Sequence, residues 1–163
     1  VFGEKLAQLH QIQEKYFGLD HNNYIGSLKQ VNQECGAWSE FYTNHRLIAL
    51  TAKARDQGLF EKKQCNWVEK LCQRLDELIP ACKPSLIHGD LWSGNLLIDT
   101  SGHPVLIDPA VYYGHPEMDW AMLSLFGSYP VEALDHYQNL HPLEKGLNER
   151  IDLHQLYPLF VCL

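Results

Sequence analysis

Three oxygen-bearing side chains near the middle of the sequence have the types and spacing of a metal-assisted site. Asp90 and Asn95 lie five residues apart in the segment HGDLWSGN, and Asp108 follows after a further turn. Two carboxylates and an amide oxygen are hard ligands suited to Mg²⁺, which prefers one or two protein carboxylates together with substrate phosphates. A carboxylate that does not bind the metal can accept a hydroxyl proton. The pattern therefore predicts phosphoryl chemistry assisted by a divalent cation.

Short apolar runs surround these side chains, at 86–88, 96–98 and 105–107. The segment DTSGHP between the second and third runs is a turn signal suited to a hairpin. If the runs form one small sheet, Asp90 and Asn95 lie on the loop that joins the first two strands. Asp108 then lies where the hairpin ends. We therefore expect the three side chains to converge on one point.

Helical periodicity accounts for most of the remaining chain. Apolar residues recur at helical spacing in the segments 1–10, 38–58, 60–79, 116 onward, 131–140 and 147 to the end. His45 is predicted on the apolar face of the second helix and Trp67 on that of the third. Residues 18–36 are rich in Gly, Asn and Tyr and are predicted to form a long ordered loop. The fold class is therefore α+β, mainly helical, with a small β-hairpin insert that carries the catalytic and metal loops.

Composition limits the classes of partner. The 163 residues are 45% hydrophobic and carry a net charge of −7, which suits one domain with a substantial core. An acidic chain without a Lys/Arg cluster argues against nucleic acid as a partner. No apolar stretch approaches the ~20 residues of a membrane-spanning helix, and the start lacks a secretory signal. Five cysteines without a C-x-x-C pair indicate reduced thiols, so we expect a cytoplasmic location without membrane or zinc binding.

The order of the polar residues resembles that of protein-kinase-like phosphotransferases. In these enzymes a catalytic-loop Asp is followed five residues later by a metal-binding Asn, and a second metal-binding Asp follows a hairpin. His88-Gly89-Asp90 stands where protein kinases have H-R-D, and Ile107-Asp108-Pro109 stands where they have D-F-G. These substitutions are typical of small-molecule kinases of the aminoglycoside-phosphotransferase type.

The resemblance becomes specific in four segments: LAQLH, NNYIGSLKQVN, HGDLWSGN and IDPAVYYGHPEMDWA. Together they resemble the fructosamine kinase / ketosamine-3-kinase family, in order and over essentially the whole chain. The resemblance implies ATP-dependent phosphorylation of the 3-hydroxyl of fructosamine or ribulosamine adducts, an activity of the deglycation-repair type. It implies that Asp90 accepts the proton and that Asn95 and Asp108 bind Mg²⁺ and, through it, ATP.

The resemblance also implies the domain organisation. Residues 1–163 correspond to a single C-terminal, catalytic and substrate-binding lobe of a protein-kinase-like fold. The N-terminal ATP-binding lobe, with its glycine-containing loop and its Lys and Glu pair, has no counterpart in this sequence, nor do the family's final helices. We therefore expect this chain alone to bind nucleotide weakly and to catalyse poorly, because positioning by the absent lobe contributes much of the rate.

Other polar and aromatic residues have more than one interpretation. His88 is predicted to brace the catalytic loop, and Asp119 is predicted to start a helix or brace a loop. Trp92 is a candidate wall of the acceptor pocket, with core packing an equal alternative. Asn23 and Tyr24 in the long loop are further candidate substrate contacts. The remaining histidines are interpreted as ordinary surface or core residues: His10, His45, His136 and His154.

Several functional alternatives remain open. Gly89-x-x-x-x-Gly94 is not a P-loop, because Asn95 and Leu96 follow where Lys and Ser or Thr are required. A two-metal phosphoesterase needs further His and Asp ligands around one bridging site. A related kinase for aminoglycosides, choline, homoserine or methylthioribose is the main alternative, and an inactive binding fragment is another. The preferred ketosamine, whether small or protein-bound, and the oligomeric state stay open.

Overall fold

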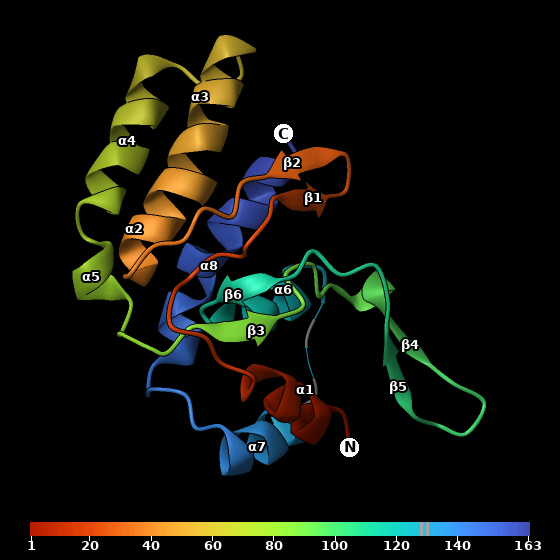
Figure 1. Ribbon diagram of the computed structural model, residues 1–163. Helices are drawn as coiled ribbons and strands as arrows, with labels where there is room; N and C mark the ends of the chain where they lie inside the picture. Colours follow the sequence, from red (N-terminus) through yellow and green to blue (C-terminus); the bar gives the residue numbers. More distant parts are fainter. Residues whose placement is uncertain (128, 130) are drawn as a thin grey trace.

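The computed structural model describes residues 1–127, 129 and 131–163 (Figure 1). The helices of these residues are α1 (Phe2–His10), α2 (Trp38–Tyr42), α3 (Ile48–Asp56), α4 (Lys62–Cys72), α5 (Leu75–Leu78), α6 (Glu117–Leu125), α7 (Val131–Leu140) and α8 (Leu147–Val161). Every segment predicted to be helical contains at least one of them. The predicted α+β class with mainly helical content is therefore confirmed.

Antiparallel two-stranded sheets complete the described fold. The strands are β1 (Asn23–Ile25), β2 (Leu28–Gln30), β3 (Ser85–Ile87), β4 (Leu96–Ile98), β5 (Pro104–Leu106) and β6 (Tyr112–Gly114). β1 pairs with β2, β4 with β5, and β3 with β6. The prediction that the three apolar runs form one sheet is wrong, because Leu86 pairs with Tyr113 while β4 and β5 pair only with each other. Three-residue strands are too short for periodicity to reveal their partners.

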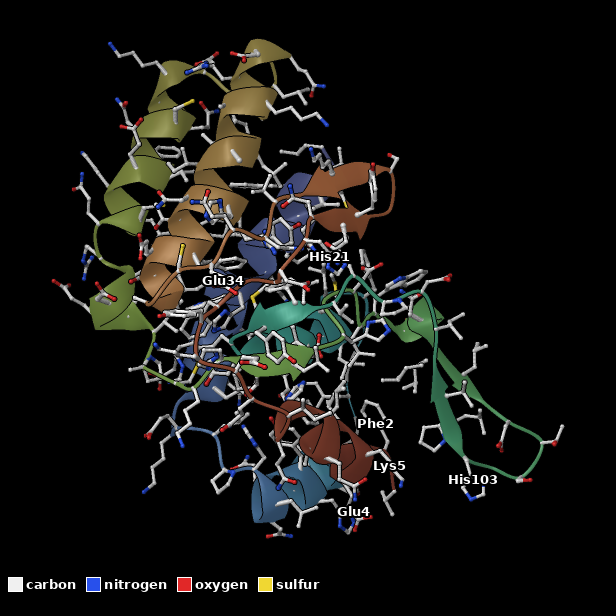
Figure 2. All side chains as sticks on the ribbon, viewed as in Figure 1. Phe2, Glu4, Lys5, His21, Glu34 and His103 are labelled. Atoms are coloured by element: carbon white, nitrogen blue, oxygen red, sulfur yellow. The ribbon has the colours of Figure 1, made fainter. Side chains whose placement is uncertain are left out.

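The β3–β6 pair lies at the centre of the molecule, with α1 and α7 on one side and α2 to α5 on the other (Figure 1). α1 packs against α7 and also contacts β3, and α6 packs against α8. The β4–β5 hairpin projects away from this body, with His103 near its tip (Figure 2). At its base the hairpin joins the loop that precedes β4 to the loop that follows β5.

Two hydrophobic cores meet beneath the loop that follows β3. One contains Tyr42 and Ile87 and lies among α2, α3, α4 and the β3–β6 pair. The other contains Leu91, Trp120 and Tyr137 and lies among α1, α6 and α7. Ile87 and Leu91 are both fully buried, so the loop between them is anchored in a different core at each end. Burial of such side chains contributes roughly 1.5–3 kcal/mol each, which holds this loop firmly in place.

The predicted helix 38–58 contains a π-helical turn. Thr43–Leu47 forms this turn between α2 and α3, so the helix is continuous but widened by one residue. The extra residue rotates the buried face of the helix. Arg46 is fully buried as a result, whereas His45 is only half-buried. The residue on the core face of this helix is therefore Arg46 and not His45, the residue that the spacing predicts.

α4 departs from its predicted pattern at Trp67. Val68 is buried on this helix, but Trp67 is 56% exposed. The two residues are about 100° apart around a helix, so only one of them can face α3. The Lys63 ammonium lies 4.9 Å from the centre of the Trp67 ring and covers part of it. The prediction that Trp67 belongs to the buried stripe is wrong.

The structure also bears on the predictions for the cysteines, for membrane-spanning helices and for the loop 18–36. All five cysteines are free, as expected, although Cys35 is buried and Cys162 is exposed. Among the described residues, no helix combines the length and the apolar character needed to span a lipid bilayer. The loop 18–36 is ordered, as expected, and it folds back as the β1–β2 hairpin.

Candidate active site

The loop between β3 and β4 begins with a glycine that no other residue can replace without strain. Gly89 has φ +80°, a backbone conformation that glycine adopts readily. A Cβ at this position would lie 2.2 Å from the carbonyl oxygen of Ala110. The loop therefore presses directly against the segment that follows Asp108, and this close approach sets the position of Asp90.

Hydrogen bonds join this loop to the segment after β5. The amide of Ala110 donates to the carbonyl of His88 at 2.9 Å, and the amide of Ile107 donates to the carbonyl of Asn95 at 3.1 Å. The His88 ring adds a third bond, from Nε2 to the Ile107 carbonyl at 2.9 Å, while its Nδ1 accepts from the Asp90 amide at 3.3 Å. The prediction that His88 braces the loop is confirmed.

The three predicted side chains line a single cavity. Asp90, Asn95 and Asp108 share the walls of a space of about 480 Å³, together with Tyr24 and Trp92. Asp108 reaches this place with φ 50°, the single non-glycine residue with positive φ in the described chain. Strained backbone of this kind persists where the surrounding structure holds it, often at functional sites. The convergence expected from the sequence is present, although the sheet that was expected to produce it is not.

The hydrogen bonds within the cavity leave oxygens available for a cation. Asn95 Nδ2 donates to the carbonyl of Asp90 at 2.8 Å and to its Oδ2 at 3.2 Å, so the amide oxygen points away from Asp90. Among the described residues, that oxygen and the exposed Asp108 carboxylate accept no hydrogen bond. An amide oxygen and a carboxylate beside an open cavity are a donor set that fits Mg²⁺.

Asp90 has the environment of a proton acceptor. Its half-buried position raises the pKa of the carboxyl, and the charges of Asp119 and Asp108 act in the same direction. His88 and the hydrogen bond from Asn95 partly offset this rise. A raised pKa makes the carboxylate more basic, which suits a group that must take a proton from an alcohol.

Asp119 on α6 holds the loop from below. Its carboxylate accepts from the amides of His88 at 2.8 Å and Gly89 at 2.9 Å. His10 Nε2 lies 3.1 Å from the same carboxylate, and His10 Nδ1 lies 2.6 Å from the Tyr137 hydroxyl. Burial raises the pKa of Tyr137, so its hydroxyl stays protonated and can donate a hydrogen bond to His10 Nδ1. Asp119 braces the loop as predicted, whereas the part played by His10 was missed.

Residues from the β1–β2 hairpin and the catalytic loop complete the cavity. Tyr24 is 63% exposed and Trp92 is 39% exposed, so both have surface available to a ligand. Asn23 is not among the residues that line the cavity. Its amide nitrogen donates to the Val111 carbonyl at 2.7 Å, and its oxygen accepts from Gln30 at 2.8 Å. Substrate contact by Asn23 stays a prediction, and its present bonds give it a role in placing the hairpin.

A buried arginine ties this hairpin to the helical body. Arg46 donates to the Val31 carbonyl at 2.6 Å and to Asn32 Oδ1 at 2.8 Å. Its guanidinium also lies over the rings of Tyr112 and Tyr157, at 4.2 and 5.1 Å from their centres. Cation–π contacts of this kind are stronger when they are desolvated. Carbonyls, an amide and aromatic rings thus replace the carboxylate that a buried cation usually needs.

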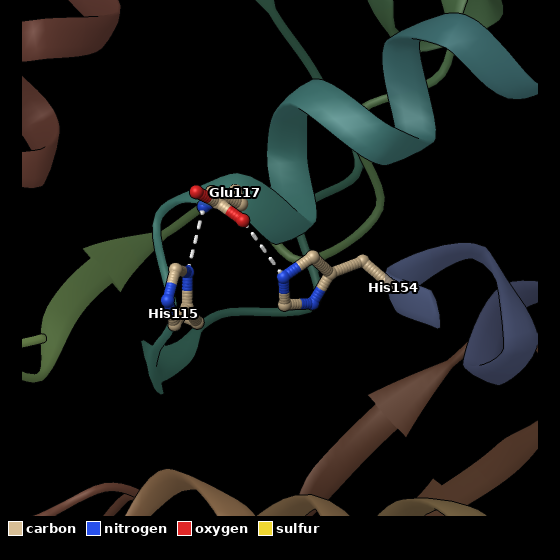
Figure 3. A group of neighbouring side chains, drawn as sticks. All are labelled: His115, Glu117 and His154. Atoms are coloured by element: carbon tan, nitrogen blue, oxygen red, sulfur yellow. Dashed lines mark hydrogen bonds and ion pairs between the residues drawn. The ribbon is translucent and has the colours of Figure 1, made fainter. Parts of the chain in front are cut away.

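A second buried polar cluster joins α6 to α8 and was not predicted. The Glu117 amide donates to His115 Nδ1 at 3.2 Å, and His154 Nε2 lies 3.1 Å from the Glu117 carboxylate (Figure 3). Arg150 donates to both carboxylate oxygens, at 2.6 and 2.9 Å. By type and separation, the candidate metal ligands of this cluster are His115, Glu117 and His154. The guanidinium neutralises the carboxylate, so the contacts present in the described residues are those of a buried ion pair.

The pKa values of this cluster follow from burial and pairing. Burial alone would raise the pKa of Glu117, but the hydrogen bonds from His154 and Arg150 outweigh it and lower the pKa to about 2. Burial lowers the pKa of His115 to about 3 and also lowers that of His154. Both imidazoles are therefore neutral near pH 7, and the only full charges are those of Glu117 and Arg150.

Comparisons with known proteins place the chain among relatives with related names. A curated relative from Lactiplantibacillus plantarum, named "Probable ketoamine kinase", is 40% identical over 100% of this chain and 59% of its own length. The chloroplastic protein-ribulosamine 3-kinase of Oryza sativa subsp. japonica is 37% identical over 96% of this chain and 46% of its own. The chain thus spans about half the length of the curated relatives that it matches.

A solved structure gives the same result in three dimensions. The crystal structure of a protein from Thermobifida fusca, assigned as a fructosamine-3-kinase, superposes with a TM-score of 0.91 at 40% identity. The match covers 98% of this chain and 56% of that one. The sequence profile described as fructosamine kinase matches residues 1–163. Because the family match covers the whole chain and the backbone superposes on a related structure, this chain belongs to the fructosamine kinase family.

Proposed function

We propose that the chain forms the metal- and acceptor-binding lobe of an ATP-dependent kinase that phosphorylates the 3-hydroxyl of ketosamines. One observation carries this proposal. Asp90, Asn95 and Asp108 line one cavity in a chain of the fructosamine kinase family, in the order that phosphoryl transfer requires. The names of the relatives, ketoamine kinase and ribulosamine 3-kinase, support ketosamines as the acceptor class.

The side chains divide the work of the reaction. The Asp90 carboxylate accepts the proton of the sugar hydroxyl as the hydroxyl oxygen bonds to the terminal phosphorus of ATP and the bond to ADP breaks. Asn95 Oδ1 and the Asp108 carboxylate would hold Mg²⁺, which neutralises charge on the phosphates when it is bound. The bond from Asn95 Nδ2 to Asp90 keeps the base and the metal ligand in a fixed relation.

The remaining length of the relatives supports a division of labour between lobes. Relatives are nearly twice as long as this chain. We assign to that further length the surface that covers the adenine and the outer phosphates of ATP. Residues 1–163 alone would then turn over slowly, because the nucleotide is incompletely positioned. A cytoplasmic location stays a prediction from the free cysteines.

A substrate panel tests the proposed function. The full-length protein, with ATP and Mg²⁺, is incubated with fructosyl-lysine, ribulosyl-lysine, an aminoglycoside, choline, homoserine or methylthioribose. We expect a phosphate ester on C3 of the two ketosamines, detected by mass spectrometry and ³¹P NMR, with kcat/KM at least 100-fold above that for the other alcohols. Preference for any of those alcohols would contradict the proposal, and turnover of none of the compounds would favour a protein that binds without catalysing.

A further inference from the structure

A second cavity opens on the other side of Asp90 and Trp92. It has a volume of about 270 Å³, and apart from Asp90 its walls are apolar. The apolar walls come from the ends of α6 and α8 and from β1, and they include Met122, Leu125, Phe126, Val161 and Ile25. Asp90 and Trp92 belong to both cavities, so the apolar space is continuous with the wall of the candidate active site.

Trp92 lines both cavities, and the backbone next to it leaves room for its ring. A Cβ on Gly94 would lie 2.2 Å from the indole ring, so glycine leaves the space in which the ring rests on the loop. The edge of the ring meets Phe126, with ring centres 5.9 Å apart and planes at 74°. An edge-to-face pair of this kind is favourable beyond simple burial, and it helps to hold the Trp92 ring beside Asp90.

The two cavities differ in the chemistry that they accept. The space around Asn95 and Asp108 offers oxygens to a cation, to phosphates and to sugar hydroxyls. The space around Met122 and Phe126 would leave a hydroxyl or a charge without a partner, because burying a polar group without hydrogen bonds is costly. A ligand that reaches both must therefore have a polar end and an apolar end, joined close to the group that Asp90 contacts.

Ketosamines have this construction, since a hydroxylated sugar is joined through nitrogen to a substituent that differs from one amine to another. We propose that the apolar cavity binds the substituent on the nitrogen, while the sugar hydroxyl lies at Asp90. The ligand class is a ketosamine whose nitrogen bears an alkyl or aryl group, of which the carbon chain of a lysine side chain is one case. This inference rests on the proposed function and adds the part of the substrate that sets its selectivity.

A series of N-substituted 1-amino-1-deoxyfructoses tests the inference with the full-length protein, ATP and Mg²⁺. The substituents are methyl, butyl, benzyl and carboxymethyl. We expect kcat/KM for the butyl and benzyl compounds to exceed that for the methyl compound at least tenfold, mainly through KM, because even one added methylene that enters an apolar pocket is worth about tenfold or more. The carboxymethyl compound is expected to have the lowest kcat/KM, since its carboxylate would have to be desolvated.

Two variants locate the effect. Phe126→Ala removes a 60% exposed wall, and Val161→Phe fills the space from the α8 side. Each is expected to lower the ratio of kcat/KM for butyl over methyl about tenfold, toward one. Trp67→Ala, which removes an exposed aromatic ring outside both cavities, is the matched control and is expected to keep the ratio of the unmodified protein.

The outcomes separate the two levels of the proposal. Equal kcat/KM across the series would overturn the inference and leave the proposed function standing, as expected if another part of the protein fills the cavity. An alkyl preference that survives both Phe126→Ala and Val161→Phe would likewise overturn it. Turnover of no ketosamine at all would overturn the proposed function, and this inference with it.

Discussion

Two polar clusters, each containing aspartate, contact the same loop, and they have opposite properties. Above the loop, Asp90, Asn95 and Asp108 form what we call the open cluster, which lines a cavity and keeps oxygens without protein partners among the described residues. Below it, His10 and Asp119 belong to the closed cluster, together with Tyr137. Its members are fully buried and hydrogen-bonded to one another and to the loop.

The difference shows that residue type alone does not decide between chemistry and support. Asp119 is fully buried and accepts from two backbone amides beside a histidine, so no part of its carboxylate is open to a ligand. An aspartate at the edge of a cavity, such as Asp108, can bind a cation but contributes little to folding. The closed cluster should therefore control stability, and the open cluster should control activity.

The largest expected effect comes from the open cluster. Asp90→Asn removes the proton acceptor while preserving shape, so kcat of the full-length protein for a ketosamine should fall at least ~10²-fold. The thermal midpoint should change by no more than about 2 °C, because the side chain is half exposed. Steady-state kinetics and calorimetry measure both quantities. Full activity of this variant would remove Asp90 from the mechanism.

The Glu117–Arg150 pair gives the next largest effect, and it depends on pH. The pKa of Glu117 is lowered from 4.5 to about 2, so the carboxylate stabilises the fold above its ordinary pKa, and this stability is lost as the pH falls from about 4.5 toward 2. This difference between the two pKa values corresponds to a contribution of about 3 kcal/mol to the free energy of unfolding. Glu117→Gln should lower the free energy of unfolding by about that amount at pH 7.

Urea unfolding of the full-length protein at pH 7, 4 and 2.5 measures this dependence. Since Gln does not titrate, the loss of stability between pH 4.5 and 2 should be smaller in Glu117→Gln than in the unmodified protein. Glu69→Gln is a suitable control, because Glu69 is an exposed carboxylate within α4 that makes no ion pair among the described residues. Parallel pH curves for Glu117→Gln and the unmodified protein would show that the ion pair does not contribute as described.

The smallest effect, and the one that joins the two clusters, is expected at Asp119. Asp119→Asn places an amide nitrogen opposite one of the two loop amides, so one charge-assisted hydrogen bond is lost at a cost of about 2 kcal/mol. The loop should also move, and kcat should fall about tenfold although Asp119 does not line the cavity. Unfolding free energy and kcat measured together distinguish this result from Asp90→Asn. If only the free energy of unfolding or only kcat changed, Asp119 would not link the stability of the loop to the activity of the site as we infer.

The sequence predicted the open cluster better than the fold around it. Asp90, Asn95 and Asp108 share a local segment, so their spacing alone suggested that they meet. Tyr113 lies far along the chain from Leu86, its partner in the sheet, and such pairings leave no local pattern in three-residue strands. The closed cluster escaped prediction for the same reason, because His10 and Asp119 are distant in sequence and come together only when α1 packs near α6.

Errors within helices have a different cause. The periodicity of residues 38–58 predicted a helix, but it could not reveal that a π turn would bury Arg46 in place of His45. Trp67 and Val68 are adjacent, and both fit the helical spacing of the apolar residues in this segment. The spacing therefore could not show that only Val68 is buried. In both cases the type of element was predictable, and the direction of one side chain depended on tertiary packing.

Arg46 gives the loop that carries Tyr24 an unusual tolerance of acid. Its partners are carbonyl oxygens, an amide and aromatic rings, none of which gains a proton in moderately acidic solution. The attachment of α8 to α6, in contrast, includes the Glu117 carboxylate, whose stabilising effect is lost as the pH falls from about 4.5 toward 2. Acidification should therefore loosen α8 from α6 before it loosens Arg46 from Val31 and Asn32. Tyr157 lies on α8 and packs on the guanidinium, so it would be the first partner of Arg46 to move.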